Sequence, residues 1–363
     1  MKRAIVSGAP GQLAYWMTKL LLEKKYKVIG TYRYSSTPIT DRFKGWDHIT
    51  DENFTLQELD ITSAENCSKI IHRYNPTEVY NFAAKSHVAE SFNCPESSFD
   101  VVAIGVLNLL NAVFRANIYG ERCRFWTASS SEMFGSNYSE DELGKYQDEN
   151  TPFSPNSPYA VAKLAAHHLV RIYRDSYNMY ACCGILHNSE SEMRGENFVT
   201  RKITKWIAEF NRWKDREFYT IGRLNVPQDM IHLGKSTSDD IPEFFPKLRL
   251  GNIDATRDWT YAEDTVRGIW LQMQQKDPKE YVFCAGDGHT VREFLQEAFR
   301  CIGVTDCYED FWVVDKKFYR PNEVEFLQGR NALAKDKLKW EPQTKFADLV
   351  KIMVEHDIDL LKK

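Results

Sequence analysis

The chain has 363 residues, of which 43% are hydrophobic and 27% are charged, as expected for a soluble globular protein with a substantial core. Its net charge of −4 disfavours a nucleic-acid or anionic-membrane partner. The eight cysteines show no CxxC pair and no paired histidines, so we expect reduced thiols and no metal site. We recognise neither a signal peptide nor an apolar run of the roughly 18 residues that span a membrane, and we expect a cytoplasmic protein.

The amino-terminal segment predicts a strand, a glycine-rich turn and a helix. The apolar residues 4–6 are followed by the turn GAPGQLA and by an amphipathic pattern over 12–24. Gly8 permits a tight turn, and Gly11 lets backbone N–H groups approach a pyrophosphate at the start of the helix. This turn therefore predicts a dinucleotide site.

The second strand, over 27–31, ends in the sequence TYRYSS. A site for NAD needs an acidic residue here to bind the ribose 2′-hydroxyl, whereas Arg33 with the serines that follow it favours the 2′-phosphate of NADP. The alternative is a solvated loop arginine. We predict NADP.

The third and fourth strands are expected over 54–60 and 78–83. The sequence TSAE, over 62–65, has the form of a capping box at the start of the intervening helix. Small residues after the fourth strand allow a cofactor to lie close, although ordinary packing is the alternative. His87, a little further on, is expected to be a hydrogen-bonded structural histidine.

The helix predicted over 99–114 is apolar on nearly every face, and such a helix must be covered on both sides. The sheet covers one side. A second subunit would cover the other, which predicts an oligomer; coverage within one chain is the alternative.

The segment 124–163 carries the residues most suited to catalysis. Tyr159 and Lys163 lie four residues apart and therefore on one helix face. The ammonium of Lys163 and a nearby cationic nicotinamide would both favour the phenolate and lower the phenol pKa from about 10 toward neutrality. Ser130 can hold the same substrate oxygen, and Glu132 offers a carboxylate for a second proton transfer. YxxxK also arises by chance in helices, but the glycine-rich turn and the preceding serine favour acid–base catalysis with hydride transfer.

The alternation of strands and helices up to the strand over 179–186 predicts an α/β fold with a Rossmann-like, doubly wound parallel sheet. We expect residues 1–186 to form an NADP-binding domain with the catalytic residues. Residues 187–363 would form a smaller α/β substrate-binding region, some segments of which return to the first domain. A stretch without clear periodicity, about 223–247, is predicted to be an inserted loop. Five basic residues of the second region could bind a diphosphate, namely Arg194, Arg201, Lys202, Arg257 and Arg320.

The sequence resembles the GDP-mannose 4,6-dehydratases, a family of extended short-chain dehydrogenases/reductases, along nearly its whole length. The resemblance rests on the stretches PTEVYNFAAKSHV, TASSSEMFG, SPYAVAK, RGENFVTRKIT, LGNIDATRDW, VREFLQEAF and RPNEVEF. RGENFVTRKIT and LGNIDATRDW are more specific than the motifs of the wider superfamily.

The resemblance implies an internal redox cycle on bound NADP. Tyr159, held by Lys163, would deprotonate the C4 hydroxyl as hydride leaves C4, with Ser130 bonded to the same oxygen. Glu132 would remove the C5 proton and assist loss of the C6 hydroxyl as water before hydride returns to C6. The product would be GDP-4-dehydro-6-deoxymannose, a precursor of deoxyhexoses such as GDP-fucose or GDP-rhamnose.

The same matching assigns two further sets of residues. Those at cofactor positions are Gly8, Ala9, Pro10, Gly11, Gln12, Leu13, Arg33, Asp60, Ile61, Phe82, Ala83, Ala84, Lys85, Ser86, Lys163 and Arg194. Those at positions facing the GDP-sugar are Asn188, Lys202, Arg257, Arg320 and Glu323. The family is commonly tetrameric, with the segment SSTPITDRF reaching a neighbouring subunit's cofactor, so we expect a homo-oligomer, tetramer or dimer.

The chain departs from the family pattern near the cofactor. Ser130 stands where the family usually has Thr, which conserves the hydroxyl. The other departures are Leu13 for Asp, Tyr34 for Arg, Ser97 for Tyr and Ser189 for His. Two alternatives remain open, namely another nucleotide-sugar epimerase or reductase of the superfamily, which would not need Glu132, and a non-catalytic NADP-binding protein.

Overall fold

The computed structural model describes residues 1–34, 43, 52–120, 122–214, 230–232, 244–305 and 308–362. In this part of the chain the largest element is a seven-stranded sheet in which every neighbouring pair is parallel. Its strands, in spatial order, are β14 (Tyr281–Phe283), β8 (Ala181–Leu186), β5 (Arg124–Ser130), β4 (Glu78–Asn81), β1 (Arg3–Ser7), β2 (Lys27–Tyr32) and β3 (Phe54–Glu58). The order reverses between β1 and β4, which confirms the predicted doubly wound sheet and places a ligand site at their carboxyl ends.

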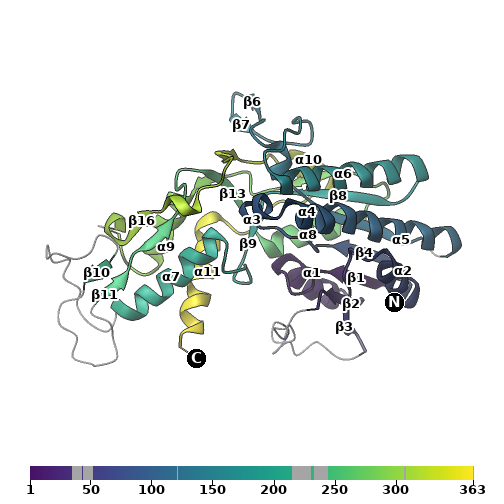
Figure 1. Ribbon diagram of the computed structural model, residues 1–363, viewed down its shortest axis with the longest axis horizontal. Coiled ribbons are helices and arrows are strands. Elements are labelled where there is room, and N and C mark those ends of the chain that lie inside the picture. The colour runs from purple at the N-terminus through teal and green to yellow at the C-terminus, as the bar shows by residue number, and fades with distance from the viewer. Residues whose placement is uncertain are drawn as a thin grey trace.

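Helices cover both faces of this sheet (Figure 1). One face carries α1 (Gln12–Glu23) and α8 (Ala262–Met273), and the other carries α2 (Ala64–Tyr74), α5 (Gly105–Tyr119) and α6 (Pro158–Tyr177). Because both faces are covered, the middle of β1 is apolar without alternation, as in the fully buried residues 4–6.

The second region surrounds a small sheet in which β13 (Thr256–Tyr261) pairs with β9 (Asn188–Glu190), β15 (Gly288–Thr290) and β17 (Phe326–Leu327). Three helices accompany it, namely α7 (Val199–Lys214), α9 (Val291–Cys301) and α11 (Phe346–Leu360). Shorter elements are α3 (Val88–Asn93), α4 (Pro95–Phe99), β10 (Met230–His232), β11 (Phe244–Pro246), β12 (Leu248–Leu250), β16 (Trp312–Val314) and α10 (Ala332–Leu338).

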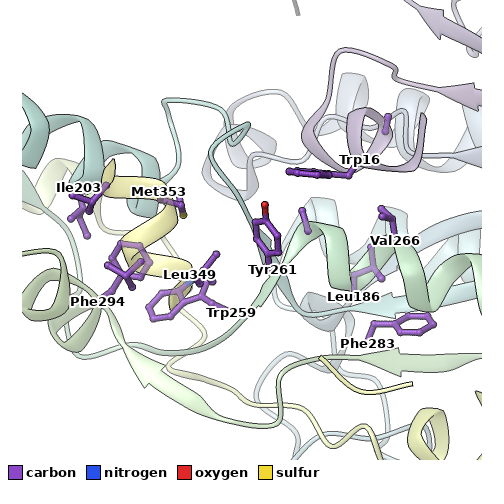
Figure 2. Packing of buried hydrophobic residues seen from close by; sticks show 14 of the residues in the cluster. Trp16, Leu186, Ile203, Trp259, Tyr261, Val266, Phe283, Phe294, Leu349 and Met353 are labelled. Atoms are coloured by element: carbon purple, nitrogen blue, oxygen red, sulfur yellow. The ribbon is translucent and has the colours of Figure 1, made fainter. Parts of the chain in front are cut away.

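One hydrophobic core continues from the large sheet into the second region. Figure 2 shows Trp16 of α1 facing Tyr261 at the end of β13, with a ring-centroid separation of 5.5 Å. Val266 and Phe283 lie on the large-sheet side of this contact, and Trp259 lies on the other side. The predicted domain division at residue 187 stays a prediction; the structure places α8 and β14, which follow it, in the layers of the large sheet.

Several local predictions need correction. The fourth strand ends at Asn81. The cap of α2 is Ser63, whose Oγ accepts the N–H of Asn66, so the helix starts one residue later than the predicted box. The loop predicted before α6 contains a hairpin of β6 (Ser139–Asp141) and β7 (Gly144–Tyr146). The predicted insertion lies mostly outside the described residues; its described parts pair as β10 and β11.

The predicted apolar helix runs without interruption through α4, a π-helical turn over Asp100–Ile104 and α5. Within the described residues, the continuous segment Pro95–Ile118 is long and apolar enough to cross a membrane by length and composition, contrary to our expectation from the sequence. Here its inner side packs against α2 and α6. Buried core helices of soluble proteins have the same composition.

Candidate active site

A cavity of about 720 Å³ lies at the carboxyl ends of β1, β4, β5 and β8, with its other wall formed by the second region. It brings together every catalytic and substrate-binding residue assigned from the sequence, and every assigned cofactor residue except Ala9. Residues as far apart in the sequence as Gly8 and Glu323 therefore share one cavity.

The glycine-rich turn has the geometry of a phosphate-binding turn. Gly8 has a φ of +72°, and a Cβ placed on it would lie 3.0 Å from the backbone of Ala83. The N–H of Gly11 donates to the Gly8 carbonyl at 2.8 Å, and Gly11 caps α1. Any side chain at Gly8 would close the gap between the turn and the end of β4, so the close approach requires glycine.

Ala9 is the one residue of the assigned cofactor set that does not line the cavity. Its N–H donates to the Thr31 carbonyl at 2.8 Å, and its methyl group packs against Gly30 of β2. The residue is fully buried and does not line the cavity, because it ties the turn to the neighbouring strand.

A buried serine that the sequence analysis missed holds the ends of β1 and β4 together. Ser7 Oγ donates to Asn81 Oδ1 and accepts the N–H groups of Phe82 and Ala83. This arrangement orients the segment 82–86, which forms one wall of the cavity. A serine at the end of an apolar strand is too common to have signalled this role.

The four predicted catalytic residues converge from three elements, namely β5, the 3₁₀ turn Ser131–Phe134 that follows it, and α6. Ser130 ends β5, and its Oγ accepts the N–H of Glu132 at 3.2 Å and hydrogen-bonds Tyr159. Tyr159 and Lys163 lie on the buried face of α6, which Ser157 caps through the N–H of Ala160. Serine, carboxylate, phenol and ammonium thus meet at one end of the cavity.

The protein groups alone do not lower the phenol pKa, so the depression expected from Lys163 together with a cationic nicotinamide stays a prediction. Burial raises the pKa of Tyr159 well above its usual value, against a smaller opposing effect of the Ser130 hydrogen bond. Burial also lowers the pKa of Lys163 to about 8, and its Nζ donates to the Ala128 carbonyl at 2.6 Å. Desolvation disfavours both charged forms, so a phenolate here needs a further positive charge at the site.

An alternating chain of charges lines the cavity beside Glu132. Arg320 Nη1 lies 3.1 Å from Glu132 Oε1 and 3.8 Å from Glu323 Oε1. The same Glu323 oxygen accepts from Arg257 Nη2 at 2.9 Å. All four side chains are at least three-quarters shielded from solvent.

The remaining cations are held in different ways. Arg194 lies 3.2 Å from Glu190 and stacks over the ring of Phe198. Lys202 Nζ lies 3.4 Å from the ring centroid of Phe318. Both cations line the cavity.

Arg201 does not line the cavity, and its predicted contact with a diphosphate is wrong. It is buried and pairs with Asp357 of α11 at 2.7 Å.

The other assigned cofactor and substrate residues also line the cavity. They are Pro10, Gln12, Leu13, Arg33, Asp60, Ile61, Ala84, Lys85, Ser86 and Asn188.

The side-chain amide of Gln12 joins the glycine-rich turn to β9. Its Nε2 donates to the Ser189 carbonyl, and its Oε1 accepts from the Ser191 hydroxyl. His87 Nδ1 accepts the Glu90 N–H at 3.2 Å and caps α3, as expected of a hydrogen-bonded histidine, but the residue also lines the cavity, so a purely structural role stays a prediction. Among the lining residues that the sequence analysis missed are His187, Asn197, Phe198, Lys317, Phe318 and Tyr319.

Similar folds occur in several solved structures. The UDP-glucose 4-epimerase of Thermotoga maritima matches with a TM-score of 0.76 and 21% identity, over 99% of each chain. The dTDP-glucose 4,6-dehydratase of Bacillus anthracis, in complex with NAD, matches with a TM-score of 0.74 and 17% identity, over 98% of this chain and 96% of that one. These neighbours share the fold of the chain, a doubly wound α/β sheet with helices on both faces and a cavity at the carboxyl ends of its strands.

Sequence comparison defines the family more narrowly. The family model for GDP-mannose 4,6 dehydratase matches residues 5–236 and 243–353. GDP-mannose 4,6 dehydratase 1 of Arabidopsis thaliana is 42% identical over 100% of this chain and 91% of its own length. The enzyme of Homo sapiens is 38% identical, over 99% of this chain and 92% of its own length. The chain belongs to the GDP-mannose 4,6-dehydratase family, which confirms the resemblance predicted from its motifs.

Proposed function

We propose that the protein is a hydro-lyase that converts GDP-mannose into GDP-4-dehydro-6-deoxymannose. The observation that carries this proposal is the position of Glu132, whose carboxylate lies in the same cavity as Ser130, Tyr159 and Lys163. An alcohol dehydrogenation needs only the last three groups. A second acid–base group beside them provides for an elimination.

The side chains divide the reaction between them. Tyr159 takes the proton of the C4 hydroxyl, while Ser130 hydrogen-bonds the same oxygen and Lys163 holds positive charge nearby. The resulting ketone acidifies the C5–H bond. Glu132 then takes the C5 proton and returns a proton to the C6 hydroxyl, which leaves as water. A nicotinamide held by the glycine-rich turn and the end of β4 would supply the hydride chemistry that the changes at C4 and C6 require.

The residues fit a nicotinamide dinucleotide. The turn at Gly8 would be filled by any Cβ, and small side chains at Ala83 and Ala84 keep the end of β4 open. The cationic ring of the oxidised cofactor would add the positive charge that a Tyr159 phenolate needs.

Arg33, at the end of β2, supports NADP over NAD, because a guanidinium suits a 2′-phosphate. Replacing Arg33 with Ala should weaken NADP binding about tenfold and leave NAD binding little changed. Equal loss for both cofactors, measured by calorimetry, would argue against the preference.

We also infer that the protein is a cytoplasmic homo-oligomer. Apolar side chains on the outer surface of α4 to α6 are partly exposed, namely Phe99, Ile104, Ile118, Val161 and Ile172. A second copy of the chain could cover them. Light scattering of the purified protein distinguishes monomer, dimer and tetramer, and cell fractionation tests the location. The segment 35–43, expected to reach a neighbouring subunit, lies outside the described residues except for Phe43.

The decisive experiment is incubation of the purified protein with GDP-mannose and NADP⁺, followed by mass spectrometry of the nucleotide sugar. We expect loss of one water without accumulation of NADPH. Glu132→Gln should abolish this loss, whereas an epimerase or reductase would retain its turnover in that variant. Cofactor binding without conversion of any nucleotide sugar would favour a non-catalytic protein.

A further inference from the structure

Arg194 presents a guanidinium to the cavity from the loop between β9 and α7. Its side chain is 18% exposed and lies over the ring of Phe198, with 3.5 Å between the guanidinium carbon and the ring centroid. Its Nε lies 3.2 Å from Glu190 Oε2, which also accepts from the Thr200 hydroxyl at 2.6 Å. A planar guanidinium suits the oxygens of a pyrophosphate, a group that both NADP and GDP-mannose carry.

The backbone of this loop is held from behind by Arg201, which does not reach the cavity. Arg201 lies in the first turn of α7 and is 7% exposed. Its Nη1 donates to the carbonyl of Glu192 and lies 3.5 Å from the carbonyl of Arg194. The buried guanidinium therefore contacts the backbone of the residue that faces the cavity, and the backbone just before it.

A carboxyl group of α11 fixes Arg201 in turn. Asp357 Oδ1 lies 2.7 Å from Arg201 Nη2, and its Oδ2 accepts from the Thr204 hydroxyl at 2.6 Å. Asp357 is 3% exposed. The helices α7 and α11 also share the hydrophobic core, where Figure 2 shows Ile203 of α7 near Met353 of α11. The loop that carries Arg194 is thus connected to a helix near the end of the chain.

A buried ion pair gives little net stability over apolar packing, because both charged groups lose their hydration. An arginine does here what an apolar side chain cannot, since its fork contacts a carboxyl group on one side and a backbone carbonyl on the other. We propose that Arg201, anchored by Asp357, is a positioning residue that fixes the loop and thereby holds the Arg194 guanidinium at a ligand pyrophosphate. This inference rests on the proposed function, which supplies the pyrophosphates of NADP and GDP-mannose.

The test is a double-mutant cycle between Arg201→Lys and Arg194→Ala, measured by calorimetry with NADP⁺ and with GDP. The lysine keeps a charge beside Asp357, but a single ammonium cannot also hold the Glu192 carbonyl as the fork does. Arg201→Lys should weaken binding of one of the two ligands about tenfold, as Arg194→Ala does. The double variant should bind no more weakly than Arg194→Ala, because Arg201 acts through Arg194.

The ligand whose binding is weakened identifies the pyrophosphate. Weaker binding of NADP⁺ alone assigns Arg194 to the cofactor, weaker binding of GDP alone assigns it to the substrate, and either result supports the proposal. Losses that multiply in the double variant, equal weakening of both ligands, or unchanged affinity for both would overturn it. Wild-type protein that binds both ligands without dehydrating GDP-mannose would refute the proposed function instead, and the binding cycle would still report on Arg201.

Two further variants complete the test. Thr204→Val removes the other hydrogen bond of Asp357 but leaves its ion pair with Arg201, so it should lower stability and keep both affinities within about twofold of the wild type. If Arg201→Lys does not fold, Asp357→Asn takes its place in the cycle, because it removes the anchoring charge with almost no change of volume. A tenfold loss in Asp357→Asn that disappears in the Arg194→Ala background supports the proposal, and a loss that persists there refutes it.

Discussion

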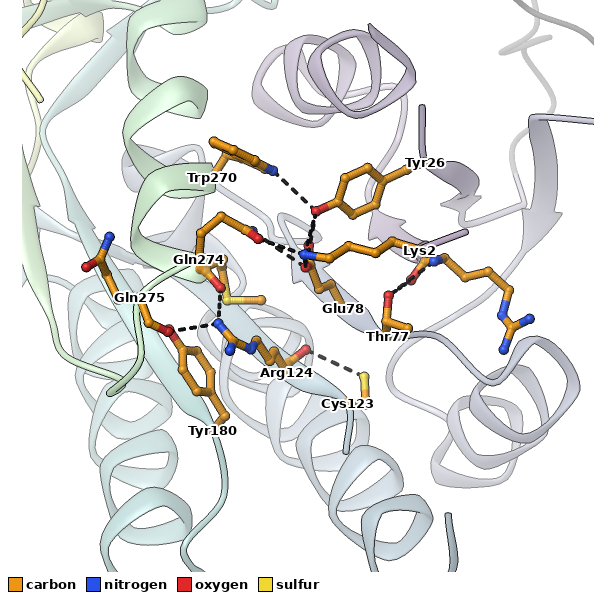
Figure 3. A network of polar contacts seen from close by, with 12 residues as sticks. Lys2, Tyr26, Thr77, Glu78, Cys123, Arg124, Tyr180, Trp270, Gln274 and Gln275 are labelled. Carbon is orange, nitrogen blue, oxygen red and sulfur yellow. Dashed lines mark hydrogen bonds and ion pairs between the residues drawn. The ribbon is translucent and has the colours of Figure 1, made fainter. Parts of the chain in front are cut away.

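The two ends of the large sheet use polar residues in opposite ways. At the amino ends of β4 and β5, the polar groups satisfy one another and connect the strands to the turn before β2 and to the end of α8. Figure 3 shows Glu78 at the centre of one such network, where its carboxylate accepts from Lys2 at 2.8 Å and from Tyr26 at 3.2 Å. Beside it, Arg124 donates to the carbonyls of Met273 and Gln275, which fixes the end of α8.

At the carboxyl ends, polar groups are held by neighbours but keep an atom facing the cavity. Lys163 donates to one carbonyl and still lines the cavity, and Glu132 uses one oxygen for Arg320. The same strands therefore carry a structural edge and a functional edge. Variants at the amino edge should change the free energy of unfolding, and variants at the cavity should change the chemistry.

The largest effect on stability is expected from Glu78→Ala at the amino edge. Glu78 is 1% exposed, and its loss would leave the fully buried hydroxyl of Tyr80 without the 2.7 Å hydrogen bond that it now donates. We expect the free energy of unfolding to fall by about 3 kcal/mol, as for other buried polar networks that lose one partner. Denaturant unfolding measures the loss, and kcat below the melting transition should be unchanged.

A matched control is Arg300→Gln, which removes an exposed ion pair with Glu297 and should leave the unfolding midpoint within error. If Glu78→Ala lowered kcat instead of stability, the division between the two edges would be wrong.

The structural edge was not predicted from the sequence, whereas most of the functional edge was. The cavity residues follow local rules, such as a glycine turn between a strand and a helix, and a Tyr and a Lys one helical turn apart. The partners of Glu78 lie at positions 2, 26, 80 and 274, and no periodicity connects them. Their contact is created only when the chain has folded.

The errors at the functional edge have a related cause. Arg201 and Lys202 are neighbours in the sequence and equally basic, but the first faces α11 and the second faces the cavity, because successive residues of a helix point in different directions. The position of Ala9 outside the cavity likewise depends on β2, which packs beside the turn. The pKa of Tyr159 could not be judged from Lys163 alone, since burial is a property of the whole fold.

A second prediction concerns pH and the carboxyl end of β8. His187 is buried, both of its ring nitrogens lack a hydrogen-bond partner among the described residues, and burial lowers its pKa from 6.5 to about 3. Between these two values the unfolded chain binds a proton that the folded protein does not, so stability falls as the pH is lowered through this window. Through His187 alone, the free energy of unfolding should fall by about 2 kcal/mol when the pH is lowered from 7 to 5.

The variant His187→Phe should remove this share of the pH dependence, because it replaces the unpartnered imidazole with an apolar ring of similar shape. Unfolding free energies of both proteins at pH 7 and pH 5 provide the measurement. His167, whose pKa burial lowers to about 4, titrates in both proteins and cancels in the difference. An identical pH dependence in the two proteins would show that His187 has a proton-binding partner in the folded state.

The smallest effect on stability is expected from a buried contact that lies behind the catalytic residues. Ser129 Oγ lies 2.9 Å from His167 Nδ1, a buried contact between β5 and α6. It connects the residue before Ser130 to the helical turn after Lys163, so it sets how the strand end and the helix meet. Ser129→Ala should cost about 1 kcal/mol of stability.

The catalytic rate of Ser129→Ala shows whether this contact belongs to the structural edge or to the functional edge of the sheet. If Ser129 positions Ser130 relative to Tyr159, Ser129→Ala should lower kcat about threefold to tenfold and leave the KM for GDP-mannose unchanged, because small misplacements act on the transition state. Loss of stability with a wild-type kcat would instead make the contact structural, like those around Glu78. Lining the cavity, as Ser129 does, would then not be sufficient for a residue to belong to the functional edge.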